Sequence, residues 1–76
     1  MPVKFDYSKL RGRIKELYKT ETEFAKELGL STVSLSGRLN NKLNFEQSEM
    51  LKIGELLSID KEDLHNYFFT RQVKKT

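Results

Sequence analysis

Apolar residues recur at helical spacing in five short stretches, and residues that start or stop helices separate these stretches. In the first stretch the apolar positions follow an i, i+3, i+7, i+10 stripe, formed by Tyr7, Leu10, Ile14 and Leu17. The pattern predicts helices over residues 7–18, 21–28, 31–41, 45–57 and 61–67. The expected fold class is therefore all-α, a compact bundle of five helices.

The remaining four helices have short apolar faces, which predicts one common core. The residues expected to point inward are Phe24, Ala25, Leu28, Leu35, Leu39, Met50, Ile53, Leu57, Leu64 and Phe68. Side-chain oxygens at helix starts predict N-caps. The expected N-caps are Asp6 or Ser8, Thr20, Ser31, Asn44 and Asp60. Thr20 with Glu23 is typical of a capping box, and Gly29 predicts a left-handed stop.

The two ends of the chain have a different pattern. Residues 3–5 alternate apolar and polar, and residues 67–73 are rich in aromatic and β-favouring types. One prediction is a short antiparallel ribbon between them, and the alternative is flexible tails. We expect a single domain over residues 1–76 with its core over about 7–68, so the ribbon or tails would take residues 1–6 and 69–76.

The stretch over residues 31–41 has an unusual outer face. On a helical wheel Leu35 and Leu39 centre the inner face, while Val33, Gly37 and Asn40 fall opposite. Ser and Thr are weak helix formers, and a helical glycine costs about 1 kcal/mol relative to alanine. A solvated helix would normally carry Glu, Lys and Gln there. Small polar groups instead favour close approach of another surface, and hydroxyls and amides can bond phosphates and base edges.

Charge and composition narrow the function. The chain has 76 residues, no cysteine and a net charge of +3. Residues 1–20 hold six Lys or Arg against two acids, whereas residues 43–66 hold two Lys against six acids. This asymmetry suits a polyanionic partner, although chance clustering explains it equally well. The lack of cysteine favours a cytoplasmic location, and no membrane span or signal peptide is expected.

A helix that stops at Gly29, a tight turn and a helix capped by Ser31 together form a helix-turn-helix pattern. Residues 20–42 resemble the lambda-repressor-like family of phage and bacterial regulators, in particular its Cro-like group. The residues that carry the resemblance are Phe24, Ala25, Leu28, Gly29, Leu30, Ser31, Leu35, Ser36 and Asn40. The resemblance covers about residues 7–68, and the two ends look like a group of short phage proteins regarded as repressors.

The chain departs from the family pattern near the end of this helix. Arg38 stands where an apolar residue is common, and Leu39 stands where relatives often have a Glu that pairs with an Arg on the first helix. The matching position on the first helix is Ile14, so an apolar contact between Ile14 and Leu39 is expected instead. Asn41 replaces a common glycine and still tolerates a left-handed backbone.

The resemblance implies sequence-specific binding of double-stranded DNA by a transcriptional regulator, a phage-type Cro-like repressor, with residues 31–41 in the major groove. The expected base contacts are Thr32, Val33, Ser36 and Gly37. The expected phosphate contacts are Thr20, Thr22, Ser31, Ser34, Arg38, Asn40, Lys42 and Asn44. The side chain of Val33 suits a thymine methyl group. Glu21 suits either a cytosine amine or the helix dipole, and Arg38 reaches either phosphate or the edge of the core.

Two alternatives stay open. A homodimer on a two-fold operator would place half-sites about 34 Å apart, with residues 61–73 as its contact, yet packing within one chain explains those residues as well. The other alternative is a protein-binding module, such as an antirepressor or antitoxin, that uses the acidic helices over 45–57 and 61–67. An enzyme is not expected, because His65 is the only histidine and no nucleophile motif accompanies it. No metal, cofactor or small-molecule substrate is expected either.

Overall fold

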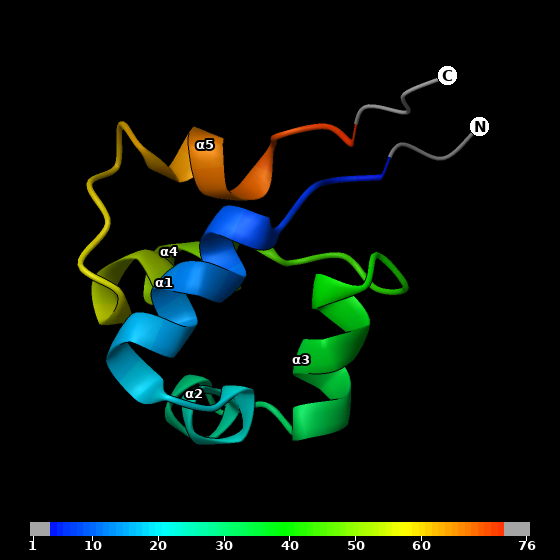
Figure 1. Cartoon of the computed structure of the whole chain (residues 1–76), viewed down its shortest axis with the longest axis vertical. Coiled ribbons are helices and arrows are strands. Elements are labelled where there is room, and N and C mark those ends of the chain that lie inside the picture. The colour runs from blue at the N-terminus through cyan, green and yellow to red at the C-terminus, as the bar shows by residue number, and fades with distance from the viewer. Residues whose placement is uncertain (1–3, 73–76) are drawn as a thin grey trace.

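The structure, a computed structural model, describes residues 4–72 and contains five helices (Figure 1). They are α1 (Ser8–Tyr18), α2 (Glu21–Leu28), α3 (Thr32–Leu39), α4 (Gln47–Leu56) and α5 (Leu64–Phe68). The prediction of an all-α five-helix fold is confirmed, with no strand among residues 4–72. In that part of the chain, no helix has the length and apolar character needed to cross a membrane.

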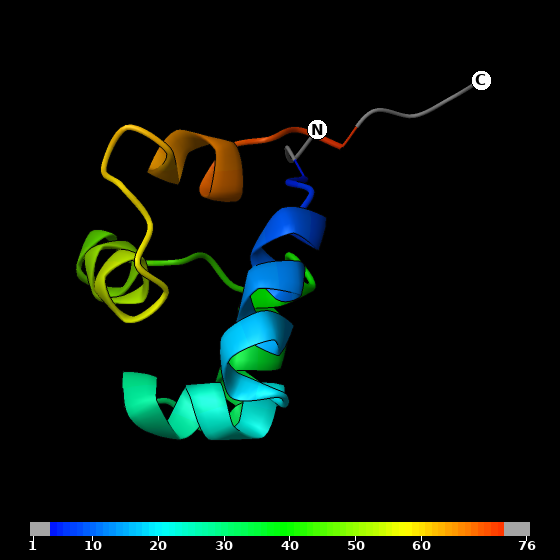
Figure 2. The ribbon, with the colours of Figure 1, turned by 60° about the vertical axis from the view of Figure 1, so that its left-hand side comes forward.

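The helices surround one apolar core. Figure 2 shows α5 at one end of α1 and α2 at the other, and α4 packs against both α2 and α5. The buried apolar residues are Tyr7, Leu10, Ile14, Phe24, Ala25, Leu28, Leu35, Leu39, Phe45, Ile53, Leu57 and Phe68. Nearly all inward positions predicted from periodicity are therefore confirmed, although Met50 and Leu64 are only partly buried at the core's edge.

The prediction for Leu17 is wrong. Its side chain is 48% exposed, whereas the neighbouring Tyr18 packs against the core. The ring of Tyr18 lies 5.0 Å from the ring of Phe24, measured between centroids. This aromatic contact closes the core at the last turn of α1, which leaves Leu17 facing solvent.

Thr20 and Ser31 are the N-caps of α2 and α3, as predicted, but only one of the two bonds of the predicted capping box of Thr20 with Glu23 forms, because the amide of Thr20 donates to the carbonyl of Tyr18. Thr20 Oγ1 accepts a hydrogen bond from the amide of Glu23, and Ser31 Oγ accepts one from the amide of Ser34. Gly29 ends α2 with a φ of 83°, a left-handed conformation that favours glycine. Local sequence signals therefore set both the end of α2 and the start of α3.

Two other predicted caps are corrected. Asn44 does not cap α4, because burial of Phe45 keeps the chain extended and α4 starts after Glu46, which forms a capping box with Glu49. Asp60 does not cap α5, since a separate turn follows it, closed by its carbonyl and the amide of Asp63. For α1 the prediction of Asp6 is confirmed in part: Tyr7 holds the N-cap position without a side-chain cap bond, but Asp6 Oδ1 accepts a hydrogen bond from the amide of Ser8, the first residue of the helix.

The terminal segments meet at one antiparallel bridge between Phe5 and Arg71. The amide of Asp6 donates to the carbonyl of Thr70 at 2.7 Å. Within the described residues, the predicted ribbon is reduced to this single bridge. Residues 1–3 and 73–76, which belong to the predicted ribbon or tails, lie outside the described residues. The side chain of Asn41 bonds both the amide and the carbonyl of Phe5, each at 2.9 Å, and so ties the end of α3 to this segment.

A partly buried ion pair joins α3 to α4. Arg38 Nε and Nη2 donate to the two carboxylate oxygens of Glu49 at 2.8 and 3.0 Å, and both side chains are 14% exposed. Arg38 Nη1 also donates to the carbonyl of Ser34, and the amide of Glu46 donates to Glu49. The pair therefore links the last turn of α3 to the first turn of α4.

Replacing Glu49 with Gln should lower the free energy of unfolding by about 1–2 kcal/mol at pH 7, because Arg38 would lose its charged partner in a partly buried site. Burial raises the pKa of Glu49, but hydrogen bonds from Arg38 and Glu46 and the charge of Arg38 outweigh it, so the pKa lies below its usual value. The stabilisation is therefore complete above the unfolded-state pKa, about 4.3, and disappears as pH falls through the lower folded-state pKa.

Urea unfolding between pH 7 and pH 3 measures both effects. The difference between the wild type and Glu49→Gln should shrink toward the acid end of this range. Glu16→Gln is the matched control, because Glu16 is 66% exposed in its ion pair with Arg13 and should contribute little. Equal effects of the two substitutions at pH 7 would contradict the role given to the Arg38–Glu49 pair.

Candidate functional site

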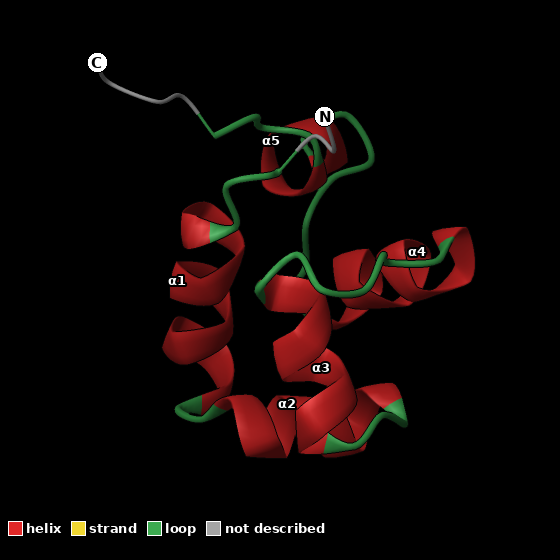
Figure 3. Cartoon of the chain, turned by 90° about the vertical axis from the view of Figure 1, so that its right-hand side faces the viewer, coloured by secondary structure: helices red, strands yellow, loops and turns green. Residues whose placement is uncertain are grey.

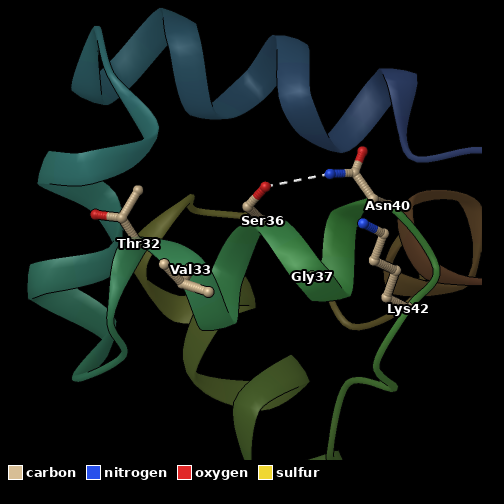
Figure 4. A pocket seen from close by; sticks show the side chains of 6 residues that line it. All are labelled: Thr32, Val33, Ser36, Gly37, Asn40 and Lys42. Atoms are coloured by element: carbon tan, nitrogen blue, oxygen red, sulfur yellow. Dashed lines mark hydrogen bonds between the residues drawn. The ribbon is translucent and has the colours of Figure 1, made fainter.

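A hollow of about 340 Å³ lies on the outer side of α3 and the turn that follows it. The residues that line it are Thr32, Val33, Ser36, Gly37, Asn40 and Lys42 (Figure 4). All four residues predicted to contact bases are among them, together with two of those predicted to contact phosphates. The structure thus brings together residues that the sequence assigned to the predicted helix over 31–41, and it adds Lys42 from the turn that follows.

The orientation of α3 follows from its inner face. Leu35 is fully buried and Leu39 is 3% exposed, so both anchor the helix in the core. Val33, on the opposite face, is 81% exposed. Figure 3 shows α3 in front, with no other helix crossing before it. The residues of the hollow are therefore open to a large partner.

Gly37 lets the turn after α3 lie close to the helix. A Cβ atom at this position would lie 3.1 Å from Leu43 Cδ1, a contact tighter than side chains normally make. The carbonyl of Gly37 accepts hydrogen bonds from the amides of Lys42 and Leu43, at 2.8 and 3.1 Å. The chain after α3 therefore folds back closely onto the helix at its one residue without a side chain.

A chain of polar contacts runs from α2 through α1 to the hollow. Arg11 on α1 donates from Nη1 to Glu21 Oε2 at 2.7 Å and from Nη2 to Asn40 Oδ1 at 2.9 Å. Asn40 Nδ2 then donates to Ser36 Oγ at 3.1 Å, the bond drawn in Figure 4. Glu21 is thus in an ion pair in the first turn of α2, a position that the helix dipole also favours.

The other predicted phosphate contacts are spread around the hollow. Thr20 and Thr22 are exposed at the start of α2, and Ser31 and Ser34 share a hydroxyl hydrogen bond at the start of α3. Asn44 lines a different hollow, of about 180 Å³, among aromatic residues that include Phe45. Thr20, Thr22, Ser31 and Ser34 thus lie at helix N-termini, while Asn44 lies apart.

Arg38 has a structural position and does not face the hollow. Its guanidinium bonds Glu49 and the carbonyl of Ser34. Sequence left two alternatives for Arg38, a contact with phosphate or a position at the edge of the core. In the structure Arg38 packs against its own fold, as in the second alternative. Lys42 is consequently the sole cationic side chain among the residues lining the hollow.

The predictions from sequence missed Arg11 as a neighbour of the hollow. The family pattern of an Arg on the first helix paired with an acid was the available signal, but it pointed to the position of Ile14. Ile14 and Leu39 both lie in the core, as expected for an apolar replacement of that pair. Arg11, one turn earlier on α1, pairs with Glu21 instead.

The chain belongs to the family described as "Protein of unknown function (DUF739)", whose model matches residues 3–71. Its structure is similar to the solution structure of the modulator of repression (MOR) of the temperate bacteriophage TP901-1 from Lactococcus lactis. The two share 37% sequence identity and superpose with a TM-score of 0.78, over 92% of this chain and 95% of that one. No curated protein matches the chain. The fold and the similarity together define a small helical protein like a phage regulator.

The two faces of α3 should respond differently to truncation. Leu35→Ala should lower the free energy of unfolding by about 2–5 kcal/mol, because it opens a cavity in the core. Val33→Ala should change it by less than about 0.5 kcal/mol, because the valine is 81% exposed. Urea denaturation followed by circular dichroism measures both. A large loss of stability in Val33→Ala would mean that this side chain supports the fold and is not free for a partner.

Proposed function

We propose that the chain is a phage regulatory protein that binds double-stranded DNA at specific sequences through the outer face of α3. The observation that carries the proposal is the hollow, which gathers Thr32, Val33, Ser36 and Gly37 on one open helical face. The similarity to a phage modulator of repression supports a role in controlling repression. The proposed place of action is the bacterial cytoplasm, and the role is one of binding without catalysis.

In the proposed complex, α2 and α3 act as a helix-turn-helix unit of Cro-like type. The major groove, about 12 Å wide, admits one helix, and the N-terminal part of α3 would meet the base edges. Val33 would contact a thymine methyl group. Thr20 and Ser31 stand at the N-termini of α2 and α3, where helix dipoles and hydroxyl groups favour phosphates. A homodimer on a two-fold operator would raise the affinity of this small surface.

A repressor protein is the second candidate partner. The relative is named a modulator of repression, a description that also fits a protein which acts on a repressor. The charge of the site favours this candidate, because Arg11 and Arg38 are held in ion pairs and Lys42 is the sole cation lining the hollow. Under this candidate the same face of α3 would dock on a protein, and the chain would act as an antirepressor.

A footprint on the DNA flanking the chain's own gene tests the leading proposal. We expect protected sites that form an inverted repeat with half-sites about 34 Å apart, as a two-fold dimer requires. The dissociation constant should rise steeply with salt, by about 0.9 log units per log unit of salt for each phosphate contact. Retention of a phage repressor in a pull-down, without any protected DNA, would favour the second candidate and reject the first.

Val33→Ala should weaken binding to the protected duplex by about fivefold or more, the lower range for a contact that reads a base. Leu51→Ala is the matched control, because Leu51 is also exposed, at 54%, but lies on α4. Fluorescence anisotropy measures both variants. Replacing the thymines of the duplex with uracil should weaken the wild type and leave Val33→Ala unchanged. If uracil has no effect on the wild type, Val33 does not contact a thymine methyl group.

A further inference from the structure

Arg11 fixes which way the amide of Asn40 points. A guanidinium group donates hydrogen bonds and accepts none. Arg11 Nη2 lies 2.9 Å from Asn40 Oδ1. The oxygen of the Asn40 amide must therefore face Arg11, and the amide nitrogen must face away. Arg11 is itself held by Glu21, whose Oε2 is 2.7 Å from Nη1. The orientation of Asn40 is therefore set from α1 and α2, outside the hollow.

The orientation of Asn40 in turn fixes the role of Ser36. Asn40 Nδ2 donates to Ser36 Oγ at 3.1 Å, so the serine oxygen is an acceptor in this bond. Its own hydrogen must then point elsewhere, and in the hydrogen bonds among residues 4–72 the Ser36 hydroxyl takes part as an acceptor and not as a donor. Ser36 lines the hollow (Figure 4). Its hydroxyl is thus available as a donor to whatever enters.

Of the other polar side chains that line the hollow, the hydroxyl of Thr32 can donate or accept, whereas Lys42 and Asn40 present donors. The ammonium group of Lys42 has only donors. The carbonyl of Gly37 is occupied by the amides of Lys42 and Leu43. One hydrogen of Asn40 Nδ2 is still free after its bond to Ser36. The part of the hollow around Gly37 therefore offers donors from Ser36, Asn40 and Lys42, and a partner that binds there must supply acceptors.

We propose that this donor-lined hollow reads a guanine, with Arg11 as the positioning residue that sets the polarity. The inference rests on the proposed binding of DNA. Guanine presents two adjacent acceptors, O6 and N7, in the major groove, whereas adenine and cytosine present an amine donor and thymine has a single acceptor. Arg11 does not touch the base. It acts through Asn40 and Ser36, 29 and 25 positions along the chain.

The test uses a duplex selected by the wild-type protein from a random library, with single guanines replaced by analogues. Replacement by 7-deazaguanine removes the N7 acceptor, and replacement by inosine removes only the minor-groove amine. At one guanine, 7-deazaguanine should weaken binding about fivefold or more, and inosine should have little effect. The measured quantity is the ratio of the two dissociation constants, for the 7-deazaguanine and unmodified duplexes.

Variants of the chain then assign the roles. Ser36→Ala and Arg11→Met should bring the ratio close to one, because the first removes the donor and the second frees Asn40 to turn. Arg11→Lys should keep most of the ratio, since lysine also donates only. Arg13→Met is the matched control, because it removes the same charge from α1 while Arg13 bonds Leu57 and Glu16 instead. A purely structural or electrostatic role of Arg11 would weaken both duplexes equally and leave the ratio unchanged.

Two negative results are distinguishable. If the wild type selects a duplex but no 7-deazaguanine weakens it, or if Arg11→Met keeps the ratio of the wild type, this inference is wrong while the proposed function stands. If the wild type selects no duplex from the library, the proposed binding of DNA fails and the guanine assignment fails with it. Thermal unfolding of each variant, followed by circular dichroism, verifies that the compared proteins are folded.

Discussion

The fixed attachment of α3 is the constraint on which the rest of the structure depends. A helix of eight residues rich in serine and threonine, with Gly37 at its centre, is not stable on its own. Leu35 and Leu39 hold it in the core, and the pair of Arg38 with Glu49 ties it to the first turn of α4. Because these contacts all lie on the inner side and the flank, the core does not need the outer side chain of Val33, which is 81% exposed.

The same attachment changes the chemistry of the exposed face. Arg38 and Arg11 both reach toward acids of neighbouring helices, so neither is free to supply a simple positive charge there. What the face offers instead is a set of hydrogen-bond donors with defined directions. Directed donors discriminate between partners of similar charge, whereas free cations attract polyanions generally. The site is therefore better suited to selecting a partner than to holding one strongly.

Local signals predicted the elements and one face of α3, but contacts between distant residues had to come from the structure. Thr20, Gly29 and Ser31 act on amides or on a backbone conformation close by in sequence. Helical periodicity placed four residues of the hollow on the outer side of the predicted helix, namely Val33, Ser36, Gly37 and Asn40. Periodicity does not say which element covers a given face. The partners Arg38 and Glu49 are 11 residues apart, and Arg11 and Asn40 are 29 apart. Local patterns predicted neither pair, nor the late start of α4, which depends on the burial of Phe45.

The separation between the anchored and the open side of α3 also bears on how such a chain can evolve. Substitutions at Thr32, Val33 or Ser36 alter the surface shown to a partner with little cost to folding, because none of these residues is buried. Under the proposed function, a lineage can therefore change its recognition quickly while keeping one scaffold. Gly37 marks the limit of this freedom, since a side chain there would press against Leu43. Proteins with this fold but different binding specificities should therefore differ at the residues around Gly37 more often than at Gly37 itself.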